Sequence, residues 1–168
     1  MVNNVVEEIK IKDMRMLVTS YSGFVDKQAS LDDIAKMLIA NPSLKSVYVV
    51  DDKLKLVGRV TLKNLIKHEF VDLLPSSFEY FDALEFIGNK TAEEIMTAPF
   101  YVKDDDALKT AFVKMYENDL EELPVVDENL HLIGNIDLIE LLTILIEKKE
   151  QKANKKYLQL VITRPFHR

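Results

Sequence analysis

The sequence predicts an α/β fold made of two copies of one β-α-β-β-α unit, and an internal repeat is the main reason. The stretch VVDDKLKLVG at 49–58 recurs as VVDENLHLIG at 125–134, so the two closing glycines lie 76 positions apart (134 − 58). Repetition at a fixed spacing indicates duplicated structural units. Around both stretches, β-branched runs alternate with apolar residues at helical spacing, which predicts strands and helices in the same order twice.

The second copy predicts its elements from breaks, caps and apolar spacing. A break at 97–99 precedes a short apolar strand, and Asp104, Asp105 and Asp106 supply N-cap chemistry for the next helix. Pro124 stands at the start of a strand, where a missing N–H is tolerated. The expected elements are a strand at 100–102, a helix with Leu108, Ala111, Phe112 and Met115 on its apolar face, strands at 123–126 and 130–136 around a turn at 127–129, and a helix bearing Leu138, Leu141, Leu142 and Leu145.

The first copy repeats this order. A strand at 24–25 precedes Ser30, which we expect to cap a helix that ends at Asn41-Pro42. An aromatic-rich stretch separates the copies and predicts a helix from about Phe78 to Ile87, ended by Gly88. The other expected elements are a helix face of Leu31, Ile34, Met37 and Leu38, strands at 47–50 and 54–60 around Asp51-Asp52, and a closing helix that begins with Leu62, Leu65 and Ile66.

Composition limits the class of protein. The 168 residues are 48% hydrophobic and 30% charged, which suits one compact domain or two small ones with a shared core. The absence of cysteine excludes a disulfide framework and a thiolate zinc site. No apolar run reaches the roughly 18 residues that a membrane helix needs, and the amino terminus lacks a signal-peptide core. We therefore expect a cytoplasmic protein without a membrane span.

Charge is distributed unevenly along the chain. The net charge of −6 argues against nucleic-acid binding, which requires a basic surface. Residues 148–168 nevertheless carry seven Lys or Arg against one acid, Glu150, so this segment is about +6 and residues 1–147 are about −12. Two interpretations remain open: a solvated helix face that leads into a basic tail, or a tail that reaches an acidic partner or the chain's own acidic body.

The order of several short motifs, found twice, resembles a tandem pair of cystathionine-β-synthase (CBS) domains, also called a Bateman module. In the second copy these motifs are Glu94-Ile95-Met96-Thr97, Ala107-Leu108-Lys109-Thr110-Ala111, Leu123-Pro124-Val125-Val126-Asp127 and Leu132-Ile133-Gly134-Asn135-Ile136; in the first they are Ser46-Val47-Tyr48-Val49-Val50-Asp51 and Leu56-Val57-Gly58-Arg59-Val60-Thr61. The resemblance extends from about Ile11 to Leu145. It implies a stand-alone protein with a first CBS domain at 8–70, a helical connector at 71–90, a second CBS domain at 91–147 and a basic C-terminal tail at 148–168.

The resemblance also implies how the chain is built and what it does. The two pseudo-symmetric β-α-β-β-α units pack sheet to sheet, and such pairs often form homodimers. They commonly bind AMP, ADP, ATP or S-adenosylmethionine in clefts and regulate a partner, and the module itself is not an enzyme. No covalent cofactor or metal is implied. The leading hypothesis is thus an adenosine-ligand sensor that controls an unidentified protein by conformational change; the alternative is a CBS scaffold that binds proteins but no ligand.

The family's nucleotide signature, G-h-x-[S/T]-x-x-D, indicates where a ligand would lie. Its hydroxyl and the following helix N-terminus hold phosphate, and its carboxylate accepts hydrogen bonds from the ribose. In the first copy Thr61 matches the signature, and Asn64 stands in place of Asp. Arg59 and Thr61 are two apart on a strand and share a face, which places a guanidinium beside the hydroxyl.

The second copy departs further from the signature. Asp137 replaces the hydroxyl residue and Glu140 replaces the Asp. Glu140 can still accept from a ribose, but Asp137 would repel a phosphate. As an N-cap, Asp137 would itself occupy the positive end of the helix. We therefore expect Asp137 to be a cap and the second cleft to be free of nucleotide.

The adenine pockets implied by the resemblance are lined by strand residues. They correspond to Phe24, Val25, Val47 and Tyr48 in one cleft and to Phe100, Tyr101, Leu123 and Pro124 in the other. All eight are equally well explained as core residues. Tyr48 stands where the family has proline and either stacks on a base or fills the pocket.

Overall fold

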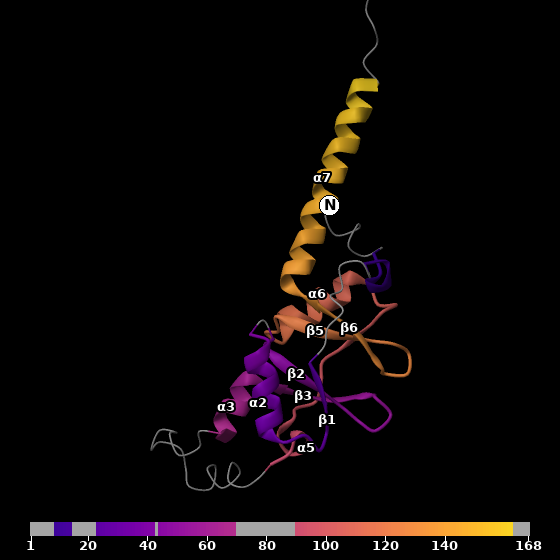
Figure 1. Cartoon of the computed structure of the whole chain (residues 1–168). Helices are drawn as coiled ribbons and strands as arrows, with labels where there is room; N and C mark the ends of the chain where they lie inside the picture. The colour runs from indigo at the N-terminus through magenta and orange to yellow at the C-terminus, as the bar shows by residue number, and fades with distance from the viewer. Residues whose placement is uncertain (1–8, 15–22, 43, 70–89, 163–168) are drawn as a thin grey trace, which may run out of the picture. The chain divides into compact units, whose positions relative to one another are not determined.

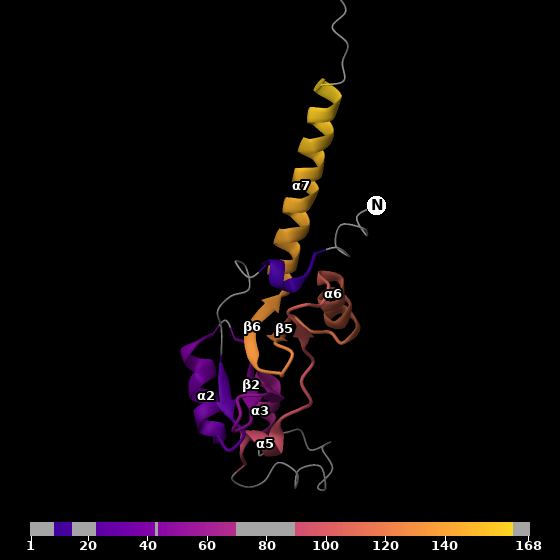
Figure 2. The same ribbon diagram turned by 90° about the vertical axis from the view of Figure 1, so that its right-hand side faces the viewer.

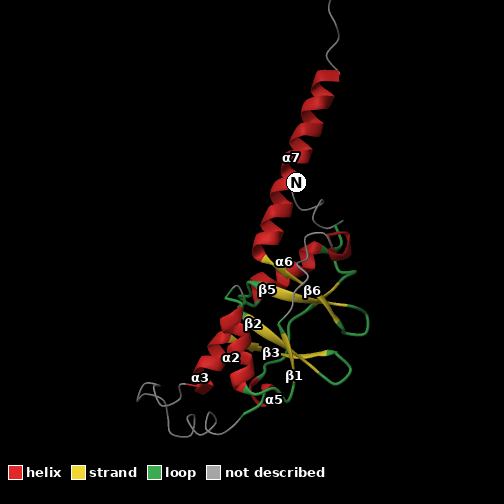
Figure 3. Ribbon diagram, viewed as in Figure 1, coloured by secondary structure: helices red, strands yellow, loops and turns green. Residues whose placement is uncertain are grey.

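The computed structural model describes residues 9–14, 23–42, 44–69 and 90–162. It confirms a mixed α/β architecture with two three-stranded sheets in these ranges (Figure 1, Figure 3). The chain divides into two compact units. Unit 1 comprises residues 1–19, 102–123 and 135–168, and unit 2 comprises residues 20–101 and 124–134. The expected connector helix from Phe78 to Ile87 lies outside the described residues.

The sheet of unit 2 is formed by β1 (Phe24–Asp26), β2 (Ser46–Val50) and β3 (Leu56–Thr61), in that order. Strand β1 is parallel to β2, and α2 (Leu31–Ala40) makes the crossover between them. Strand β3 returns antiparallel to β2. Helices α2, α3 (Leu62–Glu69) and α5 (Ala92–Ile95) gather around this sheet (Figure 2).

Helix α2 begins and ends as its sequence predicts. The Ser30 Oγ accepts a hydrogen bond from the Asp33 N–H at 3.2 Å, which satisfies a donor of the first turn. Acidic residues in that turn complement the helix dipole. At the other end, the Asn41 side chain donates to the Met37 carbonyl at 3.2 Å, and Pro42 follows.

Alternation along the strands gives the sheet of unit 2 two buried faces. One face packs on the helices and forms the main core, whose members include Val25, Val47, Val49, Val60, Ile34, Leu38 and Leu65. The opposite face forms a second cluster of Tyr48, Leu56 and Val126, with Tyr101, Leu130 and Leu132 packed against it. Strand β2 is consequently buried at every position. This explains its continuous apolar sequence.

The turns of two hairpins lie side by side within unit 2, seen as green loops in Figure 3. The Leu56 N–H donates to the Leu130 carbonyl at 2.9 Å. In the first turn, the Asp51 Oδ1 accepts from the N–H groups of Lys53 and Lys55, both at 2.9 Å. These bonds, above all that of Lys55, hold the pKa of the Asp51 carboxyl below its ordinary value.

The second turn repeats this arrangement around Asp127. Its Oδ1 accepts from the N–H groups of Asn129 and His131, both at 2.8 Å, and its Oδ2 lies 3.0 Å from the His131 Nδ1. Partial desolvation raises the pKa of Asp127, but these hydrogen bonds outweigh it, so the pKa is lowered overall. Leu54 and Leu130 both take positive φ, at 59° and 70°. The repeat thus extends to backbone conformation.

Unit 1 contains η1 (Ile11–Met14), β4 (Val102–Lys103), α6 (Leu108–Glu117) and α7 (Leu138–Ile162). The second sheet has the order β4-β5-β6, with β5 at Glu122–Val126 and β6 at Leu132–Asp137. Strands β5 and β6 cross the boundary between the units. Leu108, Ala111 and Met115 of α6 are buried as predicted, and α6 packs against α7.

Several local expectations for the second copy need correction. The strand expected at 100–102 begins only at Val102. The N-cap of α6 is Ala107, without a side-chain cap, because Asp106 instead accepts from the Lys103 N–H at 2.9 Å within the preceding turn. Phe112, expected on the buried face, is 46% exposed and stacks on Tyr116. Helix α7 extends into the basic segment 148–168 as far as Ile162, which agrees with the interpretation of a helix face that leads into a basic tail.

The two copies exchange the short helical segments that precede them in sequence. Helix α5 precedes the second copy, yet it pairs within unit 2, where the Ala92 N–H donates to the Ala29 carbonyl at 2.9 Å. Element η1 precedes the first copy, yet the Ile11 N–H donates to the Asp106 carbonyl at 3.0 Å within unit 1. The two acceptors are equivalent positions of the repeat, 77 residues apart (106 − 29). This is one more than the offset of the glycines, because the second copy has one residue fewer before its Val-Val strand. Compact units and sequence repeats therefore do not coincide, and the boundaries 8–70 and 91–147 remain predictions about the repeats.

The segment after α5 closes the free edge of β3. The Arg59 N–H donates to the Thr97 carbonyl at 3.0 Å, and the Thr97 N–H donates to the Arg59 carbonyl at 2.9 Å. Met96 then lies directly over Gly58. A Cβ built on Gly58 would stand 2.7 Å from the Met96 Cγ and 2.9 Å from its Cβ, and it would also clash with the Sδ. Gly58 is thus required by the close approach of this segment.

Gly58→Ala is expected to lower the free energy of unfolding by about 1–3 kcal/mol, because the added methyl group overpacks the contact with Met96. Met96→Ala in the same chain removes the Cγ and Sδ and should recover part of the loss. Urea denaturation of the four members of this double-mutant cycle measures the coupling. Additive effects of the two substitutions would contradict the contact.

Asp51 is expected to make unfolding sensitive to acid. Its folded-state pKa is depressed, so the stabilisation is present above the unfolded-state value and is lost as the pH falls through the folded-state value. Asp51→Asn removes this ionisation. Urea midpoints measured from about pH 5.5 down to about pH 3 should therefore fall less steeply for the variant than for the parent chain. Parallel pH profiles would reject this role for Asp51.

Candidate functional site

A row of three side chains crosses the sheet of unit 2 on the face turned away from the helices. Phe24 of β1 is the register partner of Tyr48 in β2, and Tyr48 is the partner of Arg59 in β3. Directly opposed residues project to the same face. One step further along the strands, Ser46 and Thr61 are partners on that face. The sheet therefore brings together four of the predicted ligand residues on one face: Phe24, Tyr48, Arg59 and Thr61.

The backbone of Arg59 is fixed by hydrogen bonds, whereas one donor of its side chain makes none within the described part of the chain. Its backbone N–H and carbonyl are both bonded to Thr97. Its Nε is buried and has no hydrogen-bond partner within the described part of the chain. Buried donors that carry charge are strongly favoured to find an acceptor. The chemistry that would satisfy this guanidinium is an anionic oxygen.

Thr61 ends β3 and caps α3. Its Oγ1 accepts a hydrogen bond from the Asn64 N–H at 3.1 Å, which is the usual N-cap contact. The Leu62 N–H of the same first turn donates to the Lys45 carbonyl at 3.1 Å. Thr61 and Asn64 are both half-buried. The hydroxyl hydrogen of Thr61 remains able to donate, since the cap uses only a lone pair.

The other predicted lining residues have different environments. Val25 and Val47 project to the opposite face, where their side chains are part of the helix-facing core. Phe24 is 45% exposed, whereas Tyr48 is only 1% exposed and packs in the cluster with Leu56 and Val126. Of the two interpretations left open for Tyr48, its burial in this cluster supports the filling role.

The second corner contains a reciprocal cap. The Asp137 Oδ1 accepts from the Glu140 N–H at 2.7 Å, and the Glu140 Oε2 accepts from the Asp137 N–H at 2.9 Å. This is the geometry of a capping box at the start of α7. The prediction that Asp137 is a helix cap is therefore confirmed. Two carboxylates at this helix terminus leave it unsuited to an anion.

The remaining residues expected in the second cleft are divided between the two units. Phe100, Tyr101 and Pro124 belong to unit 2, whereas Leu123, Asp137 and Glu140 belong to unit 1. Leu123 and Pro124 are buried, Tyr101 packs against the Tyr48 cluster, and Phe100 is 43% exposed. Their membership in a single cleft remains a prediction.

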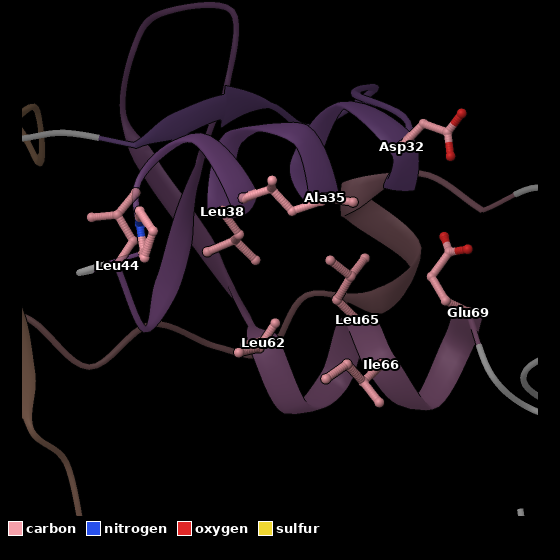
Figure 4. A pocket seen from close by; sticks show the side chains of 10 residues that line it. Asp32, Ala35, Leu38, Leu44, Leu62, Leu65, Ile66 and Glu69 are labelled. Carbon is pink, nitrogen blue, oxygen red and sulfur yellow. The ribbon is translucent and has the colours of Figure 1, made fainter.

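An apolar groove between α2 and α3 was not predicted. It has a volume of about 470 Å³, and its floor and sides include Ala35, Leu38, Ile39, Leu44, Leu62 and Ile66 (Figure 4). Ile39, Leu62 and Ile66 are 77%, 44% and 48% exposed. The sequence contained a signal, because Ile66 and Ile39 extend the apolar arcs of both helices beyond what one core needs. Asp32 and Glu69 lie together at one end of the groove (Figure 4).

The described ranges contain neither a metal site nor a membrane-spanning helix. There, no group of three or more His, Asp or Glu side chains gathers in a way that could hold a metal ion. Among the same residues, none of the helices has the length and apolar character needed to cross a membrane.

Comparison with known families identifies the fold. The CBS domain model matches residues 7–70 and 92–147, one match for each repeat. The chain belongs to the CBS domain family. Among curated relatives, inosine-5'-monophosphate dehydrogenase from Thermoplasma acidophilum is 31% identical over 111 residues, 66% of this chain and 19% of the enzyme. Protein SDS23 from Scheffersomyces stipitis is 24% identical over 110 residues, 64% of this chain and 20% of that protein. The CBS pair thus spans about a fifth of the length of these relatives.

Solved CBS structures have the same architecture. A CBS domain-containing protein from Thermotoga maritima is 30% identical, with a TM-score of 0.67 over 83% of this chain and 95% of the other. CBSX2 in complex with AMP has a TM-score of 0.62 at 24% identity, covering 83% of this chain and 98% of that one. The CBS domain pair of MJ0100, in complex with 5'-methylthioadenosine and S-adenosyl-L-methionine, has a TM-score of 0.62 at 22% identity, with 83% and 98% covered.

Asp137→Ala is expected to destabilise the chain by about 1 kcal/mol, because the first turn of α7 loses its cap. Glu140→Ala removes the reciprocal hydrogen bond, and the two substitutions should couple within one capping box. Urea denaturation of the single and double variants measures this coupling. If the loss of unfolding free energy in the double variant equalled the sum of the two single losses, the two hydrogen bonds would be independent and the capping box would be contradicted.

Proposed function

We propose that this chain is a regulatory module that binds an adenosine ligand at the corner formed by Arg59, Thr61 and Asn64. The ligand is an adenine nucleotide (AMP, ADP or ATP) or S-adenosylmethionine. The observation that carries the proposal is the buried Arg59 Nε, which has no hydrogen-bond partner among the residues that the structure describes and lies on the same sheet face as Thr61. An anionic ligand supplies the missing acceptor, and the N-terminus of α3 lies next to it. The module itself performs no catalysis and takes no covalent cofactor.

The assignment of roles follows the chemistry of the corner. Arg59 pairs with a phosphate or carboxylate oxygen, and the Thr61 hydroxyl donates to the same group. The Asn64 side chain accepts from a ribose hydroxyl. Exposed Phe24 offers an aromatic edge for the base, while buried Tyr48 forms the wall behind it. The AMP complex of CBSX2 and the S-adenosyl-L-methionine complex of MJ0100 support this ligand class.

A route from ligand to partner begins at the edge of β3. The backbone of Arg59 is paired with Thr97, so a ligand that moves Arg59 also acts on the segment that joins α5 to the second repeat. Ligand binding changes a partner's activity only if the ligand prefers one of two arrangements. We propose that the two arrangements differ in the conformation of this segment. The partner is an unidentified cytoplasmic protein, and the regulated assembly contains a homodimer of this chain.

Thr61→Val with Asn64→Ala is expected to abolish binding of AMP, ADP, ATP and S-adenosylmethionine, measured by isothermal titration calorimetry. Arg59→Gln is expected to weaken the binding of the phosphorylated ligands by about 10- to 100-fold, the range for a lost charge-assisted hydrogen bond. The binding of adenosine should not change. Ser30→Ala is the matched control. It removes the same kind of hydroxyl cap, 3.2 Å from the Asp33 N–H, from another helix of unit 2 and should bind normally.

Two results would refute the proposal. One is the absence of heat and of a thermal shift with all four ligands in the parent chain. The other is equal binding by the parent and the Thr61, Asn64 double variant. If Ser30→Ala also bound the ligands more weakly, the lost binding of the double variant would be due to a less stable unit 2.

A second function is favoured by the burial of Tyr48. Its side chain is 1% exposed and fills space on the sheet face where the family's adenine pocket would open. A chain with a filled pocket would act as a scaffold that binds proteins but no ligand. Native mass spectrometry of freshly purified protein separates the two functions, because the sensor retains a small molecule and the scaffold does not.

A further inference from the structure

The sulfur chemistry of this chain belongs to its methionines, because the sequence has no cysteine. An oxidant therefore meets no thiol of the same chain before it reaches a thioether. Of the six methionines, Met14, Met37, Met96 and Met115 lie in the described ranges. Met14 and Met115 are only 7% and 1% exposed, whereas Met37 and Met96 are half-buried. Within the described part of the chain, an oxidant in solution reaches Met37 and Met96 first.

Met96 lies against the backbone of β3. It follows α5 directly and packs on the main core of unit 2. A Cβ built on Gly58 would stand 2.7 Å from the Met96 Cγ and would clash with the Sδ. The next residue of each segment continues the contact, because Arg59 and Thr97 exchange backbone hydrogen bonds of 3.0 and 2.9 Å. The thioether thus covers the point at which the segment after α5 joins the sheet.

Hydrogen peroxide converts such a thioether into a sulfoxide. A lone pair of the sulfur attacks one peroxide oxygen, and the O–O bond breaks. The bound oxygen gives its proton to the departing hydroxide, which leaves as water. The sulfur loses two electrons and the peroxide gains them. The flexible apolar side chain becomes polar and carries a hydrogen-bond acceptor.

A sulfoxide at Met96 is incompatible with the contact on Gly58. On the side of the glycine there is no room for an added oxygen, because even a Cβ would clash there. On the side of the main core, the oxygen would be buried among apolar groups, which is costly for an acceptor without a donor. If the oxygen instead turned toward water, it would draw the side chain away from both. Each arrangement weakens the neighbouring Arg59–Thr97 pair.

We propose that Met96 is a peroxide-oxidation site whose sulfoxide releases the segment after α5 from the edge of β3. The modification is reversible, since methionine sulfoxide reductases restore the thioether. Arg59 belongs to the proposed ligand corner, so release of this edge also lowers the affinity for AMP. That last step rests on the proposed function, whereas the oxidation and the release do not.

Oxidation of the full-length chain with limiting hydrogen peroxide tests the site. Peptide mass spectrometry should find one added oxygen on Met96 and on Met37, and none on the buried Met14 and Met115. Hydrogen exchange measured by NMR should be at least about tenfold faster at the Arg59 and Thr97 amides of the oxidised chain. Treatment with methionine sulfoxide reductases should restore the slow exchange.

Three variants assign the effect to one side chain. Met96→Leu keeps an apolar side chain of similar volume without sulfur and should keep slow exchange at Arg59 and Thr97 after peroxide treatment. Met96→Gln is polar and of similar length, and it should exchange fast without peroxide. Met37→Gln is the matched control, because Met37 is half-buried and packs on the same core but belongs to α2. It should leave the exchange of both amides unchanged. Circular dichroism verifies the fold of each variant.

Four results would overturn the inference. The first is a Met96 without added oxygen while Met37 is oxidised. The second is an oxidised Met96 with unchanged exchange at Arg59 and Thr97. The third is equally fast exchange in peroxide-treated Met96→Leu, which would assign the effect to another methionine. The fourth is equal acceleration by Met37→Gln and Met96→Gln, which would assign it to the core as a whole.

Calorimetry with AMP on the reduced and the oxidised parent chain separates this inference from the proposed function. Oxidation is expected to raise the dissociation constant for AMP about tenfold, and Met96→Leu should bind AMP as the parent does before and after peroxide treatment. Equal AMP binding in both forms, despite faster exchange, would reject the coupling of Met96 to the ligand. Faster exchange in a chain that binds no AMP in either form would support the oxidation site and refute only the ligand site.

Discussion

The backbone pairing of Arg59 with Thr97 is the constraint on which the rest of unit 2 depends. It closes the edge of β3, which would otherwise present unpaired N–H and carbonyl groups. The pairing is possible only because Gly58 leaves room for Met96. It brings the segment that begins the second repeat onto the sheet of the first. It also fixes the strand position from which the Arg59 side chain projects beside Tyr48.

Helix capping explains how one position can differ so much between the two copies. Thr61 and Asp137 both end a strand and accept a hydrogen bond from the N–H three residues later. A hydroxyl and a carboxylate serve this structural role equally well. They have opposite consequences for an anion, because the hydroxyl can donate while the carboxylate repels. The fold therefore tolerates a divergence that separates the two corners chemically.

Local patterns predicted much of the fold. The repeat, the strands, the Asp51 and Asp127 turns and the caps at Ser30 and Asp137 all follow from residues close in sequence. Features set by distant contacts did not follow. Ala107 caps α6 although three aspartates precede it, because the bridge to Lys10 and the turn around Asp106 set the start of that helix.

The candidate site was predicted to a similar extent. The signature placed Arg59, Thr61 and Asn64 near one strand end, but strand alternation alone did not assign Val25 and Val47 to the helix-facing core. The burial of Tyr48 depends on Val126, which the chain supplies from the other repeat. The exposed Leu142 and Ile146 of α7 could not be distinguished from core residues by spacing, since both faces of that helix carry leucine and isoleucine.

The exchange of η1 and α5 has a consequence for how such a chain can arise and fold. Ile11 must meet Asp106 before unit 1 is complete, so its assembly waits for most of the chain to be synthesised. A chain with a single repeat would lack the segment that the other copy provides. It could obtain that segment only from a second molecule, as in a swapped dimer. Duplication within one chain turns that intermolecular exchange into a permanent intramolecular one, with no dependence on concentration.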